Sequence, residues 1–112
     1  MSRHASIIAL PESNIAEYKR LHAAVWPEVL AMIRRVHIRN YSIYLRRLPD
    51  GRFYLFSYFE YTGTDFAADM ALMAADPRTQ AWWQLCKPLQ DPLPDRDEGE
   101  WWAGAEEVFH CD

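Results

Sequence analysis

Cysteine and glycine are scarce in this sequence, and neither residue type forms a motif. The two cysteines, Cys86 and Cys111, make neither a disulfide framework nor a CxxC metal pair. With only four glycines there is no glycine-rich phosphate loop, which argues against a nucleotide cofactor. No apolar run approaches the roughly 20 residues of a membrane span, and the run near the start is too short for a signal peptide. We therefore expect a reduced, cytoplasmic protein with no membrane partner.

Positive charge is also in short supply. Twelve Lys and Arg residues stand against sixteen Asp and Glu residues, which gives a net charge of −4, and no basic cluster stands out beyond Arg46-Arg47. Binding to a nucleic-acid backbone needs a basic stripe, so we expect no nucleic-acid partner. His4 and His37 have no acidic, Cys or His partner at ligand spacing, and we expect no metal site.

Apolar residues, by contrast, are abundant. Half of the 112 residues are hydrophobic and 14% are aromatic, so the chain can build a core. This length suits one compact domain and leaves no room for two. We therefore expect a single domain over residues 1–112.

Hydrophobic periodicity and turn residues predict the order of secondary-structure elements. The region 12–36 has a helical pattern, and Pro27 bends it because proline cannot donate a backbone hydrogen bond to the preceding turn. A turn at 49–51 joins two alternating segments into a hairpin. The acidic, proline-rich segment 88–100 is interpreted as a loop. The predicted elements are strand 5–10, bent helix 12–36, strands 38–47 and 53–60, helices 65–75 and 77–87, and strand 106–111.

This order is β-α-β-β-α-β, the ferredoxin-like α+β arrangement, in which both helical regions cover one face of an antiparallel sheet. The opposite face then carries large side chains of the hairpin, such as Tyr54, Phe56 and Tyr58. Apolar patches of this size rarely stay exposed. Either a second subunit covers this face or it lines a ligand cavity, and we expect a homodimer.

Tyr18 and His22 form the first candidate site. They are four residues apart, which places them on one face of a helix. A tyrosine hydroxyl beside an imidazole can position a hydroxylated ligand and pass a proton, because histidine titrates near neutrality. The structural alternative is a histidine bonded to a neighbouring backbone group.

Aromatic residues supply the second candidate. Trp82 and Trp83 point about 100° apart on a helix, so one can pack inward while the other offers a flat apolar plate to a sugar ring. The alternative is a pair of core or dimer-contact tryptophans. Tyr41 is a third candidate hydroxyl, for which sheet packing is the alternative. Trp101 and Trp102 are interpreted as anchors of the acidic loop.

Four separated motifs resemble the L-rhamnose mutarotase family, in the same order and over nearly the whole chain. They are Tyr18-x-x-x-His22-x-x-Val25-Trp26-Pro27-Glu28, Asn40-Tyr41-Ser42-Ile43-Tyr44, Trp82-Trp83 and Glu107-Val108-Phe109-His110. The resemblance implies a dimeric, ferredoxin-like α/β barrel that interconverts the α and β anomers of L-rhamnose without a metal or organic cofactor. It implies that His22 is the proton donor. It also implies that Tyr18, Tyr41, Trp82 and Trp83 bind the sugar.

Mutarotation opens the hemiacetal ring, lets C1 turn and closes the ring on the other face. Opening needs a proton on the ring oxygen and the loss of one from the C1 hydroxyl, which is acid–base chemistry that histidine can perform. We hypothesise that protonated His22 gives its proton to the ring oxygen.

Several alternatives stay open. The acidic segment 88–100 is longer than in the simplest family members, and some relatives with this kind of C-terminal half act on L-fucose. An L-fucose mutarotase is therefore the first alternative. The others are a dimeric α/β-barrel oxygenase or haem protein, with the helix histidine as haem ligand, and a non-catalytic sugar-binding module.

Overall fold

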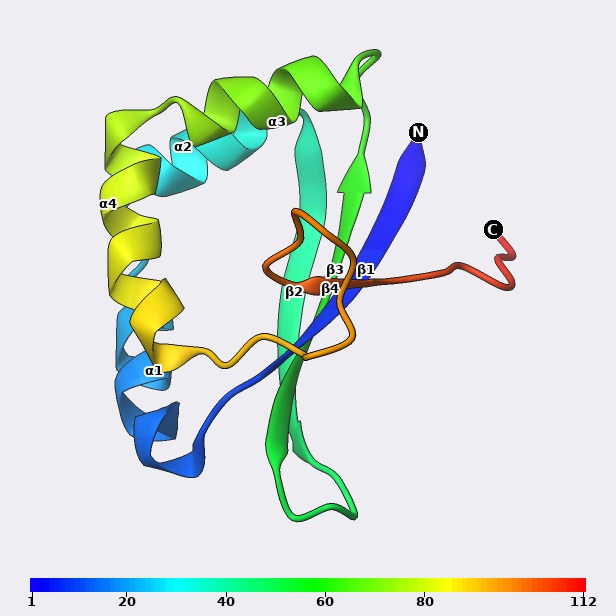
Figure 1. The fold of residues 1–112 in the computed structure, drawn as a ribbon. Coiled ribbons are helices and arrows are strands. Elements are labelled where there is room, and N and C mark those ends of the chain that lie inside the picture. Colours follow the sequence, from blue (N-terminus) through cyan, green and yellow to red (C-terminus); the bar gives the residue numbers. More distant parts are fainter.

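Four strands form one antiparallel sheet, and four helices lie on one side of it (Figure 1). The computed structural model describes all residues 1–112. None of its helices has the length and apolarity that crossing a membrane requires. The strands are β1 (Ser2–Ala9), β2 (Ile38–Arg47), β3 (Phe53–Tyr61) and β4 (Ala103–Ala105), in the spatial order β2-β3-β1-β4. The helices are α1 (Ile15–His22), α2 (Pro27–Arg35), α3 (Phe66–Ala74) and α4 (Pro77–Cys86), with 3-10 turns at Glu12–Asn14 and Lys87–Leu89.

The predicted β-α-β-β-α-β order is confirmed, with each helical region divided into two helices. Both second helices begin with a proline at their first turn, Pro27 in α2 and Pro77 in α4. Proline suits this position because the first backbone N–H groups of a helix have no partner within it. The side chain of Asp76 caps α4 by accepting a hydrogen bond from the backbone N–H of Thr79 at 3.0 Å.

The hairpin of β2 and β3 contains a one-residue irregularity. Between the pairs Arg39–Glu60 and Ser42–Tyr58, β2 has two residues where β3 has one. The extra residue is Asn40, whose φ of 50° lies in the left-handed region. Asn40 also donates a hydrogen bond to a Glu60 carboxylate oxygen at 2.8 Å. Such a shift exchanges the faces of all later residues in the strand.

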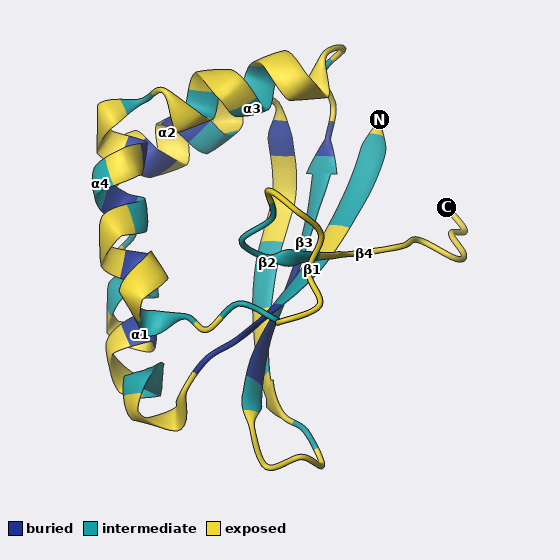
Figure 2. Cartoon of the chain, viewed as in Figure 1, coloured by how far each residue is buried: buried dark blue, intermediate teal, exposed yellow.

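The core lies between the helices and the inner face of the sheet. Its largest cluster joins Ile8 of β1 and Leu55 of β3 to Tyr18, Val29 and Trp82 of three helices. Figure 2 shows the buried positions on the helix sides that face the sheet and on the strands behind them. Full burial of one such aliphatic side chain contributes about 1.5–3 kcal/mol to folding, so this cluster holds the two layers together.

The edge of β1 is covered by the segment that follows α4. The backbones of Ala9 and Asp91 exchange two hydrogen bonds, of 3.1 and 2.9 Å. Further along the same edge, β4 pairs with residues 5–7 of β1. The predicted strand 106–111 is therefore wrong, because the small residues of β4 make this pairing and the chain then leaves the sheet.

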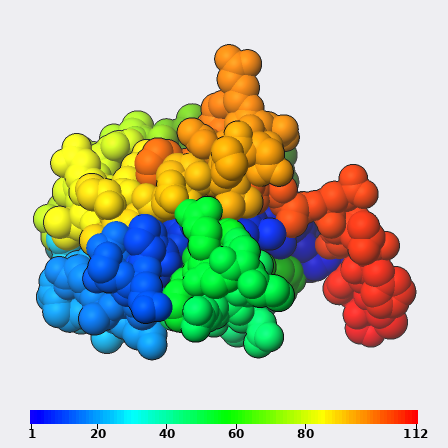
Figure 3. All heavy atoms as spheres, turned by 60° about the horizontal axis from the view of Figure 1, so that its bottom comes forward, coloured from blue at the N-terminus to red at the C-terminus, as the bar shows by residue number.

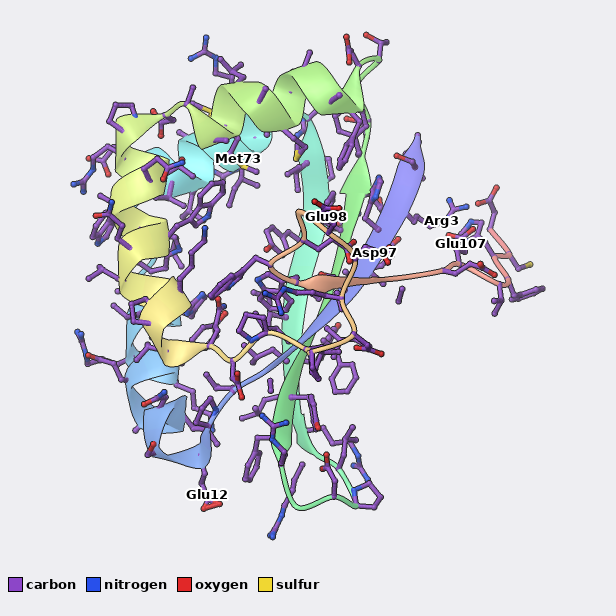
Figure 4. The ribbon with its side chains drawn as sticks, viewed as in Figure 1. Arg3, Glu12, Met73, Asp97, Glu98 and Glu107 are labelled. Atoms are coloured by element: carbon purple, nitrogen blue, oxygen red, sulfur yellow. The ribbon has the colours of Figure 1, made fainter.

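Residues 106–112 form no helix or strand. They extend from the body of the molecule (Figure 3), with Val108 and Phe109 86% and 81% exposed. Their base is held by Arg3, whose Nε donates to a Glu107 carboxylate oxygen at 2.8 Å. Figure 4 shows Arg3 and Glu107 together beside β1.

We predict that position 40 tolerates glycine but not a β-branched residue. Asn40→Val places a stiff side chain in the left-handed region and should lower the free energy of unfolding by about 1–3 kcal/mol. Asn40→Gly removes only the bond to Glu60 and should stay within about 1 kcal/mol of wild type. Urea unfolding measures both. Ser42→Val is the matched control in the regular part of β2, and an equal cost at positions 40 and 42 would contradict the prediction.

Candidate active site

A cavity of about 270 Å³ opens between the helices and the inner face of the sheet. It therefore lies on the helix side, not on the opposite face that the sequence offered as one possible cavity wall. All five residues proposed from the sequence line it, and six others complete the lining. The full set is Tyr18, His22, Tyr41, Ile43, Trp82, Trp83, Cys86, Lys87, Gln90, Trp101 and Trp102.

Tyr18 and His22 lie side by side on α1, as their spacing predicts. Their ring centroids are 4.1 Å apart, with an angle of 21° between the planes. Tyr18 is only 5% exposed, and its hydroxyl accepts a hydrogen bond from Gln90 Nε2 at 3.3 Å. Burial raises the pKa of Tyr18 well above its ordinary value, so the phenol is neutral at physiological pH.

The His22 ring is fixed through one nitrogen. Its Nδ1 lies 2.9 Å from the backbone carbonyl oxygen of Tyr18. Because a carbonyl only accepts, Nδ1 carries the hydrogen, and the neutral ring has its lone pair on Nε2. The structural alternative from the sequence, a histidine bonded to a neighbouring backbone group, therefore holds for His22. The same ring also lines the cavity, so the two interpretations are compatible.

The surroundings of His22 also favour the neutral ring. Burial lowers the pKa of His22, and the bond to the Tyr18 carbonyl opposes this shift in part. The neutral form therefore predominates at neutral pH. In this form Nε2 is the only imidazole nitrogen that can accept a proton from a ligand.

The two adjacent tryptophans of α4 divide as the sequence predicts. Trp82 is 6% exposed, and its ring meets those of His22 and Trp26 edge to face, at centroid distances of 5.4 and 5.3 Å. Trp83 is half-buried and lines the cavity. Trp82 thus backs the His22 ring, while Trp83 presents part of its own surface to the open space.

Tyr41 reaches the cavity because of the bulge at Asn40. The register shift puts Tyr41 and Ile43 on the face that carries Phe59, and the rings of Tyr41 and Phe59 lie 5.5 Å apart. Tyr41 is 43% exposed, which leaves room for a ligand against it.

Sequence reasoning missed Gln90 and gave Trp101 and Trp102 only an anchoring role. Trp101 donates its indole N–H to Gln90 Oε1 at 2.8 Å and forms part of the cavity wall with Trp102. Lys87 lies between two indoles, with Nζ 5.6 Å from the Trp83 centroid and 5.4 Å from that of Trp101. The only available signal was the second tryptophan pair in the sequence.

A second, more apolar cavity of about 400 Å³ adjoins the first. The two share five lining residues, among them His22 and Tyr41, and the second extends toward α2 and α3 along Val29, Ile33 and Met73. In Figure 4 Met73 lies on the side of α3 that faces α2.

Cys86 and the other potential metal ligands complete the chemistry of the site. Burial raises the pKa of the Cys86 thiol to about 11, so it is protonated and a weak nucleophile. No three His, Cys, Asp or Glu side chains lie close enough together to hold a metal ion. The polar groups of the lining residues are two phenol hydroxyls, one imidazole, one amide, one ammonium group, the Cys86 thiol and the indole N–H groups of the tryptophans.

Comparison with known proteins identifies the family. A profile of L-rhamnose mutarotase sequences matches residues 3–111. The chain belongs to the L-rhamnose mutarotase family. A member from Opitutus terrae named L-rhamnose mutarotase is 34% identical over 112 residues, which cover both chains completely. The resemblance seen in the four sequence motifs is confirmed.

Two further relatives extend this comparison. A protein from Xanthomonas campestris named L-fucose mutarotase is 38% identical over 99 residues, covering 85% of this chain and 74% of that protein. The crystal structure of L-rhamnose mutarotase FA22100 from Formosa agariphila superposes with a TM-score of 0.75 over all of both chains, at 21% identity. This chain thus has sequence relatives named for either sugar, and the structural likeness supports the fold.

We predict that His22 titrates below the ordinary histidine value of about 6.5 and is an Nδ1–H tautomer when neutral. Burial disfavours the charged ring, and the Tyr18 carbonyl holds the Nδ1 hydrogen. Nitrogen-15 NMR of the imidazole, recorded against pH and assigned with His22→Asn, measures both properties. A midpoint at or above 6.5, or an Nε2–H tautomer, would contradict this description.

Proposed function

We propose that this chain is a mutarotase that interconverts the α and β anomers of a 6-deoxyhexose, with L-rhamnose as the leading substrate. The observation that supports this most is the convergence of His22 with two tyrosines and two tryptophans around one cavity, in a member of the L-rhamnose mutarotase family. The proposed mutarotase domain is the whole of residues 1–112.

The cavity suits one sugar ring. Its volume of about 270 Å³ is just below the range of about 300–1,000 Å³ that is usual for drug-sized ligands. We propose that Trp82 and Trp83 hold the apolar face of the sugar and its C6 methyl group. The hydroxyls of Tyr18 and Tyr41 would bind the sugar hydroxyls. Most of the binding free energy then comes from aromatic surface, and the few polar groups set the orientation.

In the proposed reaction His22 transfers one proton between two oxygens. Neutral Nε2 accepts the proton of the C1 hydroxyl, and the bond from C1 to the ring oxygen breaks with its electron pair leaving on that oxygen. The imidazolium gives the proton to the ring oxygen, which completes the open-chain aldehyde and restores neutral His22. Rotation about the C1–C2 bond and reversal of the steps form the other anomer.

This sequence of steps revises the hypothesis that protonated His22 acts first. The revision rests on the Nδ1 bond to Tyr18 and the lowered pKa of His22. One nitrogen can serve both oxygens because both are bonded to C1, so no second titrating side chain is needed.

Each of the two sugars, L-rhamnose and L-fucose, has support from a sequence relative. The relative named for L-rhamnose matches over its full length, and the relative named for L-fucose has the higher identity over a shorter match. These sugars differ in hydroxyl stereochemistry, which a site that hydrogen-bonds each hydroxyl can distinguish strongly. L-Fucose is therefore the alternative substrate.

We predict that His22→Asn lowers the enzyme-catalysed anomer exchange by about 10²–10⁴-fold, because it removes the proton-transferring group. The measurement is NMR saturation transfer between the anomeric protons, on L-rhamnose and on L-fucose at equal protein concentration. Sugar binding, followed by chemical-shift titration, should remain.

The matched control is His37→Asn, since His37 is exposed and lines neither cavity, and asparagine accepts its positive φ. Unchanged exchange in His22→Asn would remove His22 from the mechanism. If wild type binds a sugar without accelerating exchange, the binding-module alternative takes precedence.

We propose further that the outer face of the sheet binds a second copy of the chain. Tyr44, Phe56 and Ile7 are direct cross-strand neighbours on this face, and Tyr44 is 64% exposed. The adjoining row on one side is free of charge, with Ser42 paired to Tyr58, and the row on the other side pairs Arg46 with Tyr54. An uncharged aromatic centre with charged residues toward the rim, here Arg3, Arg39, Arg46 and Glu60, is typical of protein interfaces, and the family resemblance implies a dimer.

We predict that Tyr44→Asp weakens this dimer at least about tenfold, because it places an unpaired charge in the interface. Tyr44→Phe is the matched control, since it keeps the ring and should keep the dimer. Sedimentation velocity over a range of concentrations measures the association. A wild-type protein that stays monomeric throughout that range would overturn the dimer proposal.

A further inference from the structure

Three side chains form a hydrogen-bond chain that runs from the acidic loop into the cavity. Trp101 Nε1 lies 2.8 Å from Gln90 Oε1, and Gln90 Nε2 lies 3.3 Å from the Tyr18 hydroxyl oxygen. An indole N–H only donates, so the amide oxygen of Gln90 must face Trp101. The amide nitrogen must then face Tyr18, which fixes the direction of both hydrogen bonds.

The direction of these hydrogen bonds decides whether the Tyr18 hydroxyl is a donor or an acceptor toward a ligand. Its oxygen already accepts the hydrogen bond from Gln90, so its own hydrogen points to another acceptor. Both residues line the cavity, and Tyr18 has no acceptor among the side chains. The free hydrogen is thus available to a ligand oxygen.

We propose that Gln90 is a positioning residue, held by Trp101, that makes the Tyr18 hydroxyl a hydrogen-bond donor to the bound sugar. This inference rests on the proposed mutarotase function of the same cavity. It assigns a role to two residues of the C-terminal region that sequence reasoning did not place in the site. Neither residue transfers a proton in the proposed reaction.

The backbone around Gln90 is held on both sides, as a positioning role requires. The Gln90 N–H donates to the Lys87 carbonyl at 3.1 Å, and the next residue, Asp91, is bridged to Ala9 of β1. On the preceding side, Asn14 Nδ2 donates to the Leu89 carbonyl at 2.9 Å. The amide group of Gln90 therefore projects from a fixed point toward the Tyr18 hydroxyl.

The substitution Gln90→Glu tests the direction of the hydrogen bonds from Trp101 through residue 90 to Tyr18, because glutamate has nearly the same size and shape as glutamine. An ionised carboxylate only accepts, so Tyr18 must turn its hydrogen toward it and away from the sugar. We expect KM for the sugar to rise about tenfold, with kcat within about threefold of wild type, since binding is affected more than proton transfer.

Lowering the pH should reverse this defect. The protonated carboxyl can accept from Trp101 and donate to Tyr18, which restores the direction found in wild type. The ratio of the KM of Gln90→Glu to that of wild type, taken at each pH, should therefore fall toward one as the introduced carboxyl is protonated. A merely structural role of Gln90 predicts no such recovery.

Gln84→Glu is the matched control, because Gln84 is exposed on α4 and lines neither cavity. It introduces the same charge without altering the hydrogen bonds among Trp101, Gln90 and Tyr18. A KM for Gln90→Glu that equals that of Gln84→Glu at every pH would overturn the inference.

The role of Trp101 is tested by a double-mutant cycle. Trp101→Phe removes the N–H but keeps an aromatic ring, which frees the Gln90 amide to rotate. We expect this change to raise KM about threefold to tenfold in the wild-type background and to have no further effect in Gln90→Leu. Equal effects of Trp101→Phe in both backgrounds would mean that Trp101 acts by packing alone, and would overturn its proposed role.

These measurements separate the two levels of the proposal. If wild type accelerates exchange of neither sugar, the proposed function fails. If wild type is active but the pH-dependent recovery and the coupling between Gln90 and Trp101 are both absent, the function stands and the positioning role fails.

Discussion

The arrangement of the site depends on the alternation of side chains along β2. A strand presents successive residues to opposite faces, and here only one face has helices against it. Ile38 packs beside Met32 and Val36 on the helix side, and Tyr41 and Ile43 line the cavity on the same side. Regular alternation cannot place positions 38 and 41 on one face. The extra residue at Asn40 reconciles them, so the core contact and the site depend on the same left-handed residue.

Tyr18 links the two halves of the site. Its backbone carbonyl holds the Nδ1 hydrogen of His22, and its hydroxyl receives the amide hydrogen of Gln90. The carbonyl oxygen only accepts, so the imidazole nitrogen that faces it must donate. The amide N–H of Gln90 only donates, so the Tyr18 hydroxyl oxygen that faces it must accept. In this way the Tyr18 carbonyl sets the tautomer of the imidazole, and the Gln90 amide sets the direction of the Tyr18 hydroxyl hydrogen. The aromatic walls provide surface, while these two bonds provide direction.

Features with a local cause could be predicted from the sequence. Proline fixed the break at Pro27, and the alternating pattern with its Pro-Asp-Gly turn gave the hairpin within one residue. Helical spacing and the family motifs identified five residues that prove to share one cavity. Strand β4 was missed because Ala103-Gly104-Ala105 has little intrinsic strand preference and owes its conformation to pairing with β1. Gln90 was missed because its place depends on the bridge between Ala9 and Asp91, residues far apart in sequence.

The C-terminal segment is attached to β1 at two places, which lets the stretch between them vary between relatives. Residues 92–102 form a loop whose two ends are pinned to one strand, by the bridge at Asp91 and by β4. Doubling the length of a flexible loop costs only about 0.6 kcal/mol, so the stretch between the pins can be lengthened or exchanged while the sheet stays intact. Trp101 and Trp102 of this loop form one part of the cavity wall, and residues outside the loop form the rest. The loop can therefore differ between relatives, and alter this part of the cavity wall, without rebuilding the fold.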